Sequence, residues 1–288
     1  MSLAQTKQTQ TSDRLQVLRY WLVTHPSILI GGGLVVAIVI AALGAPWLTH
    51  YAPDAQDLLN TLQGPSTAHL FGTDDYGRDI FTRVIYGARI TVFEVVLSVG
   101  LSLVVGVPLG VIAGLGHRWL DQIIMWVMDI IFAFPGIVLA ILIVSVLGEG
   151  LINMLIAISI FSIPVYARLS RNLTLDLKTM EYVEAAHALG VRHSRIISRY
   201  IIRNAIGPLI VQSTLTAGSI VLAAASLSFL GLGVQPPMPE WGTMMSDGRN
   251  FLGLDIYLSL FPGLAILVTV LGFNILGDGL SDLLDSRS

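Results

Sequence analysis

Six long apolar stretches constrain this chain of 288 residues more than any other feature of its sequence. A helix that crosses the bilayer core needs about 20 apolar residues, at a rise of about 1.5 Å each. Only 12% of the residues are charged, against about 25% in soluble domains, and no polar segment is long enough for a core of its own. The sequence therefore predicts an all-α membrane protein with six transmembrane helices. The stretches are Ile28–Leu48, Ile90–Leu115, Ile123–Leu147, Leu151–Ala167 (the shortest), Ala205–Leu230 and Leu258–Leu276.

The distribution of Lys and Arg predicts how the chain is oriented in the membrane. With the N-terminus inside, 12 of the 16 Lys and Arg residues fall in inner segments, and the opposite orientation inverts this bias. We therefore expect both termini in the cytoplasm, outer loops at about 50–88 and 231–257, and a large inner loop at about 168–204. Residues 1–27 lack the apolar core and cleavage site of a signal peptide, so we expect a retained cytosolic tail before a transmembrane domain over 28–288.

The inner loop contains the segment EYVEAAHALG, which ends at Gly190 and has the pattern of a short helix. Thr179 is expected to be its N-cap, and Glu181 and Glu184 lie in its first turns, where the helix dipole favours carboxylates. Gly190 suits the left-handed position that ends a helix. A helix over 180–189 is marginal in water, so we expect its apolar face to pack on another part of the chain. That face consists of Tyr182, Val183, Ala186 and Leu189.

The carboxylates of this segment fit three functions: metal binding, hydrolysis or docking. Glu184 and His187 have the spacing of some metal-binding helices, but the apolar stretches supply no second Glu–His pair and HExxH is absent. Hydrolysis by Glu181 and Glu184 needs a walled cleft, which a short loop does not provide. A docking surface is favoured, because small Ala side chains permit close approach and the charges fix the partner.

After Gly190 a second helical pattern begins, with four arginines at spacings of 3, 4 and 4 on one face. Contact with lipid headgroups is favoured for them over a specific protein contact, because basic residues collect at the inner surface of a membrane. They are Arg192, Arg195, Arg199 and Arg203.

The first outer segment carries a charged cluster between turn-forming glycines. Asp74, Asp75, Arg78 and Asp79 lie within six residues of one another. Their spacing is only partly that of a calcium loop, because Ile85 stands where the bidentate Glu of such a loop belongs. We therefore expect an ordered, ion-paired loop.

The second outer segment combines three prolines with an aromatic residue. Pro236, Pro237 and Pro239 precede Glu240 and Trp241. Prolines fix the backbone and Trp suits a membrane interface. A stiffened external loop and a landing surface for an external partner both fit this pattern.

One side of the fifth apolar stretch is polar, with small side chains at spacings of 4, 3, 4 and 3. Such residues serve helix packing in membranes, and they also suit the wall of a water-filled pathway. Ionisable residues in the stretches are few, whereas a proton-coupled carrier typically buries several in a relay. The polar side consists of Gln212, Thr216, Ser219, Ala223 and Ser226, and the ionisable residues are Glu94, Asp129 and Asp278.

The segment Glu184-Ala185-Ala186-x-x-x-Gly190 resembles the EAA motif of the permease subunits of bacterial ABC importers. Three further segments are similar to the C-type permeases of the dipeptide, oligopeptide and nickel group, and the chain also looks like the glutathione permeases. The resemblance covers about residues 20–285, with the motifs in the expected order. The three segments are GTDDYGRD (Gly72–Asp79), LSFLGLGVQPPMPEWG (Leu227–Gly242) and FNILGDGLSDLLD (Phe273–Asp285).

This resemblance implies a type I ABC importer permease fold in the bacterial inner membrane, surrounded by lipid and without a nucleic-acid partner. A second, B-type permease would complete the pathway, two cytosolic ATPases would bind ATP and Mg, and an extracytoplasmic binding protein would deliver substrate. The chain itself would hold no catalytic residue, metal or cofactor, in keeping with the lack of a G-x-x-x-x-G-K-[ST] motif. The inner helix would dock on an ATPase through Glu181, Glu184, Ala185, Ala186, Ala188 and Gly190. The binding protein would contact Asp74, Asp75, Arg78, Asp79, Glu240 and Trp241.

The sequence departs from the family pattern at Arg203, where a proline is usual. Without the proline, the helix is expected to continue more smoothly into the fifth stretch. Small peptides are the favoured substrate, with glutathione and nickel chelates as alternatives, because a separate binding protein sets much of the selectivity. A self-sufficient carrier or channel is the competing class, and an intramembrane enzyme is less favoured because no catalytic constellation lies at one membrane depth.

Overall fold

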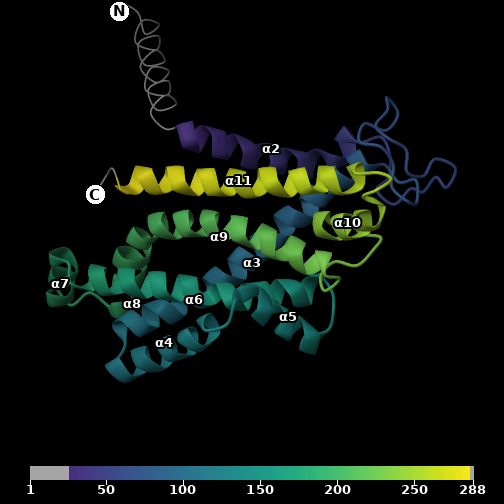
Figure 1. Cartoon of the computed structure of the whole chain (residues 1–288). Coiled ribbons are helices and arrows are strands. Elements are labelled where there is room, and N and C mark those ends of the chain that lie inside the picture. The colour runs from purple at the N-terminus through teal and green to yellow at the C-terminus, as the bar shows by residue number, and fades with distance from the viewer. Residues whose placement is uncertain (1–25, 286–288) are drawn as a thin grey trace, which may run out of the picture.

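The computed structural model describes residues 26–285, which are almost entirely helical (Figure 1). These residues contain no strand, only an isolated bridge between Thr73 and Asp79. The predicted tail over 1–27 lies outside the described residues, apart from its last two. Five helices within this described range are long and apolar enough to cross a membrane: α2 (Pro26–Leu48), α3 (Ile80–Leu115), α6 (Leu151–Lys178), the helix Ser194–Phe229 that includes α9 (Arg203–Phe229), and α11 (Tyr257–Asp285).

The third apolar stretch, Ile123–Leu147, expected as one of the six transmembrane helices, forms two helices. α4 (Arg118–Phe132) and α5 (Gly136–Leu147) meet at an angle of 90°. Pro135 lies at the break, and proline both lacks an N–H and disfavours helical backbone at the residue before it. The bent pair, counted as one span, would be the sixth.

Two of the long helices extend beyond the apolar stretches that predicted them. α3 begins at Ile80 rather than at Ile90, because Asp79 caps it by accepting a hydrogen bond from the Thr82 amide. The first outer loop is therefore shorter than predicted. α6 continues past Ala167 to Lys178 and so forms part of the predicted inner loop.

α3 and α6 pack along a seam of small residues. Gly106, Gly110 and Gly114 lie on this seam, and a Cβ at Gly110 would lie only 2.0 Å from Ser170 Oγ. Across the same seam, Ser102 Oγ donates a hydrogen bond to a carbonyl of α6. A four-residue repeat of glycines is typical of close helix packing in membranes, and it holds the centre of this bundle together.

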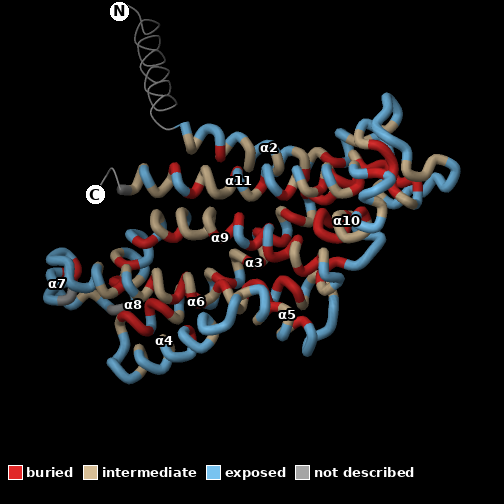
Figure 2. Tube along the Cα trace, viewed as in Figure 1, coloured by how far each residue is buried: buried red, intermediate tan, exposed pale blue. Residues whose placement is uncertain are grey.

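The two ends of the bundle carry different elements (Figure 1). The α10 end consists of the loop 49–79 and α10 (Trp241–Gly248), which is followed by the short helix η2 (Arg249–Phe251). The α7 end consists of α7 (Glu181–Ala188), α8 (His193–Ile196) and the π-helical turn η1 (Ile197–Ile202). The first and last described residues lie on the side of the α7 end (Figure 1). Buried residues are frequent at the α10 end and scarce in α7 (Figure 2).

Candidate coupling, pathway and outer contact sites

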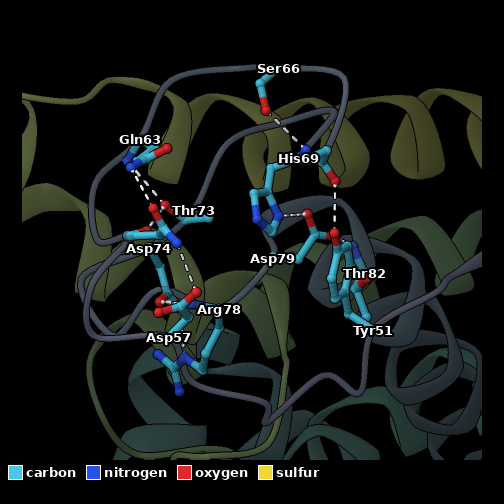
Figure 3. A network of polar contacts seen from close by, with 12 residues as sticks. Tyr51, Asp57, Gln63, Ser66, His69, Thr73, Asp74, Arg78, Asp79 and Thr82 are labelled. Atoms are coloured by element: carbon cyan, nitrogen blue, oxygen red, sulfur yellow. Dashed lines mark hydrogen bonds and ion pairs between the residues drawn. The ribbon is translucent and has the colours of Figure 1, made fainter.

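At the α10 end, Asp79 organises the loop that leads into α3 (Figure 3). One carboxylate oxygen accepts a hydrogen bond from the Thr82 amide at 2.7 Å, and the other lies 2.9 Å from His69 Nδ1. The side chain of Asp79 is buried. It therefore acts as a helix cap that also ties the loop to the start of the span.

Asp74 and Arg78 form an ion pair inside the same loop. Asp74 Oδ2 lies 2.6 Å from Arg78 Nε, while Oδ1 accepts hydrogen bonds from the amides of Tyr76 and Arg78. Arg83 lies beside them and donates to the carbonyls of Pro53 and Pro237, at 3.0 and 3.2 Å. The predicted ion-paired loop is confirmed, and Arg83 joins it to the second outer segment.

Glu240 and Trp241 anchor α10 in the interior. The Glu240 carboxylate accepts hydrogen bonds from the amides of Gly242 and Thr243, at 2.9 and 2.7 Å. Burial raises the pKa of Glu240, and these hydrogen bonds oppose that shift. Trp241 Nε1 donates to the Val84 carbonyl at 2.9 Å. Both residues are 1% exposed, so Trp241 packs inside the chain.

Most residues of the predicted binding-protein contact are buried. Five of the six predicted residues are buried, and their polar atoms are used within the chain. Asp75 is the exception, with 25% of its side chain exposed. The five residues that are buried within the chain are Asp74, Arg78, Asp79, Glu240 and Trp241.

A cavity of about 560 Å³ lies where the α4–α5 break faces α6 and α9. Gln212, Thr216 and Ser219 line it, whereas Ala223 and Ser226 do not. Ala223 is buried against other helices, and the Ser226 hydroxyl bonds its own helix. Three of the five predicted pathway residues thus share one cavity, while Ala223 is buried and Ser226 lines a different pocket beside α11.

The sequence interpretation missed the aromatic part of this cavity. Phe132, Phe134 and Pro135 from the break, with Phe161 from α6, form much of its wall. The available signal was the Phe-x-Phe-Pro sequence in the middle of an apolar stretch, because the proline marks a break that exposes its neighbours. Among residues 26–285, no charged side chain lines the cavity.

At the α7 end, α7 is a helix of 8 residues that makes few contacts with the rest of the chain. Its carboxylates at Glu181 and Glu184 are exposed, together with Ala185 and Ala188. Ala186 is buried, as expected of the packed apolar face, although the family resemblance also places it among the docking residues. The exposed surface of α7 is therefore small, acidic and able to approach another surface closely.

The ends of α7 were predicted with partial success. Gly190 has φ +75°, the left-handed conformation expected of it, and the Val191 amide donates to the Ala186 carbonyl at 3.1 Å. Thr179 caps the end of α6 and is not the N-cap of α7. The carbonyl of Met180 accepts the first hydrogen bonds of α7 instead.

One small apolar cluster holds α7 to the bundle. Val183 is buried together with Ile196 and Ile201, and Leu177 of α6 packs against them. Tyr182 and Leu189, which were predicted to share the packed face, are exposed. Tyr182 nevertheless contacts the chain, with its ring centroid 6.0 Å from that of Tyr200 and its hydroxyl accepting a hydrogen bond from Asn204 at 3.3 Å. The packing prediction therefore fails at Leu189, which is 84% exposed.

The helix does continue into α9 at Arg203, as the missing proline predicted. The continuation is not regular, since the π-helical turn Ile197–Ile202 immediately precedes Arg203. π-helical turns insert an extra residue and change which face the following side chains occupy. Where the family usually has a proline, this chain therefore has a π-helical turn directly before Arg203.

Comparison with known proteins identifies the fold and the family together. Residues 106–288 match the family model described as the binding-protein-dependent transport system inner membrane component, and this match covers more than half of the chain. The chain belongs to this family. Residues 16–65 additionally match the N-terminal transmembrane domain of oligopeptide transport permease C.

Among curated relatives of this permease, the dipeptide transport system permease protein DppC of Alkalihalophilus pseudofirmus is 47% identical over 259 residues, covering 90% of this chain and 85% of the relative. The glutathione transport system permease protein GsiD of Pectobacterium atrosepticum is 44% identical over 264 residues, covering 90% and 86%. In the solved MetNI methionine ABC transporter, one chain matches with a TM-score of 0.58 at 19% identity, covering 69% of this chain and 94% of that chain.

These similarities confirm the predicted ABC importer permease fold and family. The permease is a multi-pass inner membrane protein and a transport subunit, not an enzyme. It functions within a transporter complex that includes an ATPase and other subunits.

Proposed function

We propose that this permease forms one half of the pathway of an ATP-driven importer of small peptides, with a second, B-type permease as the other half. The dipeptide permease relative supports this substrate class, and the glutathione permease relative keeps a modified tripeptide as the second candidate. Both are peptides, whereas neither relative is named for nickel.

The cavity at the α4–α5 break supports a pathway for neutral or zwitterionic peptides. Its wall combines aromatic side chains with the hydroxyl and amide groups of Ser162, Gln212 and Thr216. A wall without charge can contact many peptide side chains without binding any of them tightly. Transport requires such weak binding, because the substrate must leave the site again. We infer that substrate passes along this side of α9.

The α7 end supports the proposed coupling site, and this is the observation that carries the proposal. α7 projects from the bundle on the side opposite to α10 (Figure 1). The exposed face of α7 carries Glu181, Glu184, Ala185 and Ala188. Neither glutamate forms a salt bridge with another residue in the described part of the chain. We infer that this face, ended by Gly190, docks on an ATPase, which holds ATP and Mg.

This assignment also orients the chain. If α7 meets a cytosolic ATPase, both termini are cytoplasmic, because the first and last described residues lie on the α7 side (Figure 1). The bias of Lys and Arg supports the same orientation. The α10 end then faces the external binding protein, with exposed apolar residues such as Leu59 and Leu254 on its surface.

Uptake into proteoliposomes tests the proposed function. The purified chain alone is compared with the complex that contains the second permease, the ATPases and the binding protein, using labelled dialanine and labelled glutathione. We expect ATP-dependent uptake of dialanine by the complex only. Uptake by the chain alone would overturn the importer assignment, and uptake of glutathione without dialanine would assign the second candidate.

A further inference from the structure

A second groove, apolar and of about 600 Å³, lies between α3, α9 and α11. At about 100° per residue, the mean direction of its α9 lining residues differs from that of Gln212 and Thr216 by roughly 110°, so the groove and the pathway cavity use different sides of α9. The volume lies within the range of about 300–1,000 Å³ that is typical of small-molecule sites. Residues that line the groove include Val96, Gly100 and Leu103 of α3, Ile206 and Ile210 of α9, and Phe273 of α11.

Two arginines precede the α9 lining of this groove on its α7 side. Arg203 lies three residues before Ile206, about 60° from it around α9, and Arg199 lies in the π-helical turn η1. Both are exposed, and neither has a salt-bridge partner among residues 26–285. The groove therefore has an unpaired positive charge at one end and apolar walls beyond it.

The dimensions of the groove match one leaflet of a bilayer. From Ile206 to Ala217 the α9 lining rises about 16 Å, at about 1.5 Å per residue. Half of a hydrocarbon core about 30 Å thick is about 15 Å. An acyl chain that fills the groove from the α7 end would thus end near the bilayer midplane, with its head group beside Arg203.

We propose that this groove binds one acyl chain of an anionic glycerophospholipid, whose phosphate is held by Arg199 and Arg203. A guanidinium binds phosphate oxygens in a fork geometry, and basic groups near the membrane surface attract anionic lipid. A second permease is the other possible occupant of an apolar groove. A helix of another protein would gain nothing from two arginines at the mouth, unless it carried acidic residues there.

Filling the groove provides the sharpest test. A Cβ at Gly100 meets no atom within 4 Å, so Gly100→Leu places a side chain in the groove without disturbing the helix. Gly33→Leu is the matched control, because Gly33 of α2 is equally open and lies outside the groove. The complete transporter is purified in detergent after exchange into phosphatidylglycerol, and the phospholipid retained per complex is counted by mass spectrometry.

We expect the parent and Gly33→Leu to retain one phosphatidylglycerol more than Gly100→Leu. If Gly100→Leu does not assemble, Ile210→Trp fills the same groove from an exposed position. Equal retention in the parent and the filled-groove variants would overturn the proposal.

The arginines are tested by charge removal. In nanodiscs of mixed phosphatidylglycerol and phosphatidylcholine, Arg199→Gln with Arg203→Gln should lower the preference for phosphatidylglycerol on the order of tenfold. Arg192→Gln with Arg195→Gln is the control for loss of general surface charge. An equal loss in both pairs would reject a defined site.

Because the chain has no cysteine, Val96→Cys can also be tested for cross-linking to the second permease, and an efficient cross-link would assign the groove to that subunit.

Discussion

The α10 end and the α7 end of this permease use their polar residues in opposite ways. At the α10 end, three carboxylates are buried and bonded within the chain: Asp79 caps α3, Glu240 caps α10, and Asp74 pairs with Arg78. At the α7 end, Glu181 and Glu184 are exposed and α7 is held by one small apolar cluster. The contrast is visible in the burial of the two ends (Figure 2).

This difference indicates what each end requires from other chains. Buried polar groups must be satisfied internally, since each unpaired one costs about 1–3 kcal/mol, and the α10 end therefore forms as part of the folded monomer. The exposed carboxylates of α7 lose nothing in water, so the monomer gains little by fixing them. We infer that the α10 end is a rigid platform and that the α7 end becomes ordered mainly by its partner.

The largest expected effect is a difference in the free energy of unfolding between substitutions of two apolar side chains, one at each end. Trp241 is 1% exposed and hydrogen-bonded, whereas Leu189 is 84% exposed. Trp241→Ala should lower the free energy of unfolding by about 3–5 kcal/mol, because it leaves a cavity and frees a buried carbonyl. Leu189→Ala should leave stability unchanged. Thermal unfolding of both variants in detergent measures the difference, and equal midpoints would contradict the assignment of rigidity to the α10 end.

The next largest effect is a loss of ATP-driven uptake without a change in thermal stability. Glu184→Arg reverses an exposed charge on α7, so we expect ATP-driven uptake to fall at least about tenfold, which corresponds to about 1.4 kcal/mol of lost docking energy. Copurification of the ATPases with the permease measures docking directly. Thermal stability should not change, since Glu184 has no salt bridge within the described chain.

Asp176→Arg is the matched control for this charge reversal. Asp176 is an exposed carboxylate near the end of α6 and lies outside α7. We expect it to retain most uptake and full ATPase binding. If both variants lose the ATPases equally, the effect belongs to the net charge of this end rather than to the face of α7.

The comparison of the two ends also explains what the sequence could predict. Apolar stretches, the bias of Lys and Arg and the left-handed Gly190 depend on local composition and spacing, and the structure agrees with the stretches and with Gly190. The burial of Glu240 and Trp241 was missed, because it depends on α10 folding back onto α3 and α9. Sequence periodicity does not report a contact between Trp241 and Val84, which are far apart in the chain.

The break at Pro135 shows a second limit of sequence reasoning. Every apolar stretch carries or adjoins a proline, yet Pro46, Pro164 and Pro262 lie inside continuous helices. Neighbouring helices can satisfy the carbonyls that a proline frees, so the outcome is decided by packing. Because the sequence does not show which proline breaks its helix, Phe132 and Phe134 were not included in the predicted pathway.

A smaller effect is expected at the end of α7. Gly190 has φ +75°, and a Cβ there meets no atom within 4 Å, so Gly190→Ala costs only the strain of the left-handed backbone, about 1 kcal/mol. Local opening of residues 181–191 should become about fivefold more frequent, which hydrogen exchange of their amides measures. Gly190→Asn should restore much of the protection, because Asn tolerates this conformation. Unchanged exchange in Gly190→Ala would show that the cap does not stabilise α7.

The smallest effect is a pH dependence confined to the α10 end. Burial, reinforced by the nearby charge of Asp74, raises the pKa of Asp75, and burial followed by the charge of Asp75 raises the pKa of Asp247. A carboxyl whose pKa is higher in the folded state binds more protons there than in the unfolded state. Stability therefore increases as the pH falls from neutral through the raised pKa, until the unfolded state is protonated near pH 3.8.

Asp75→Asn removes this contribution. We expect the variant to unfold at a slightly higher temperature than the parent at pH 7.5, with the difference vanishing toward pH 4.5. Asp247→Asn should behave alike, and the double substitution should change the midpoint by less than the sum, because the two carboxylates raise each other's cost. A difference between parent and variant that stays constant across this pH range would show that neither carboxyl titrates with the folding of the α10 end, and that its buried charges are compensated by Arg78 and Arg83 alone.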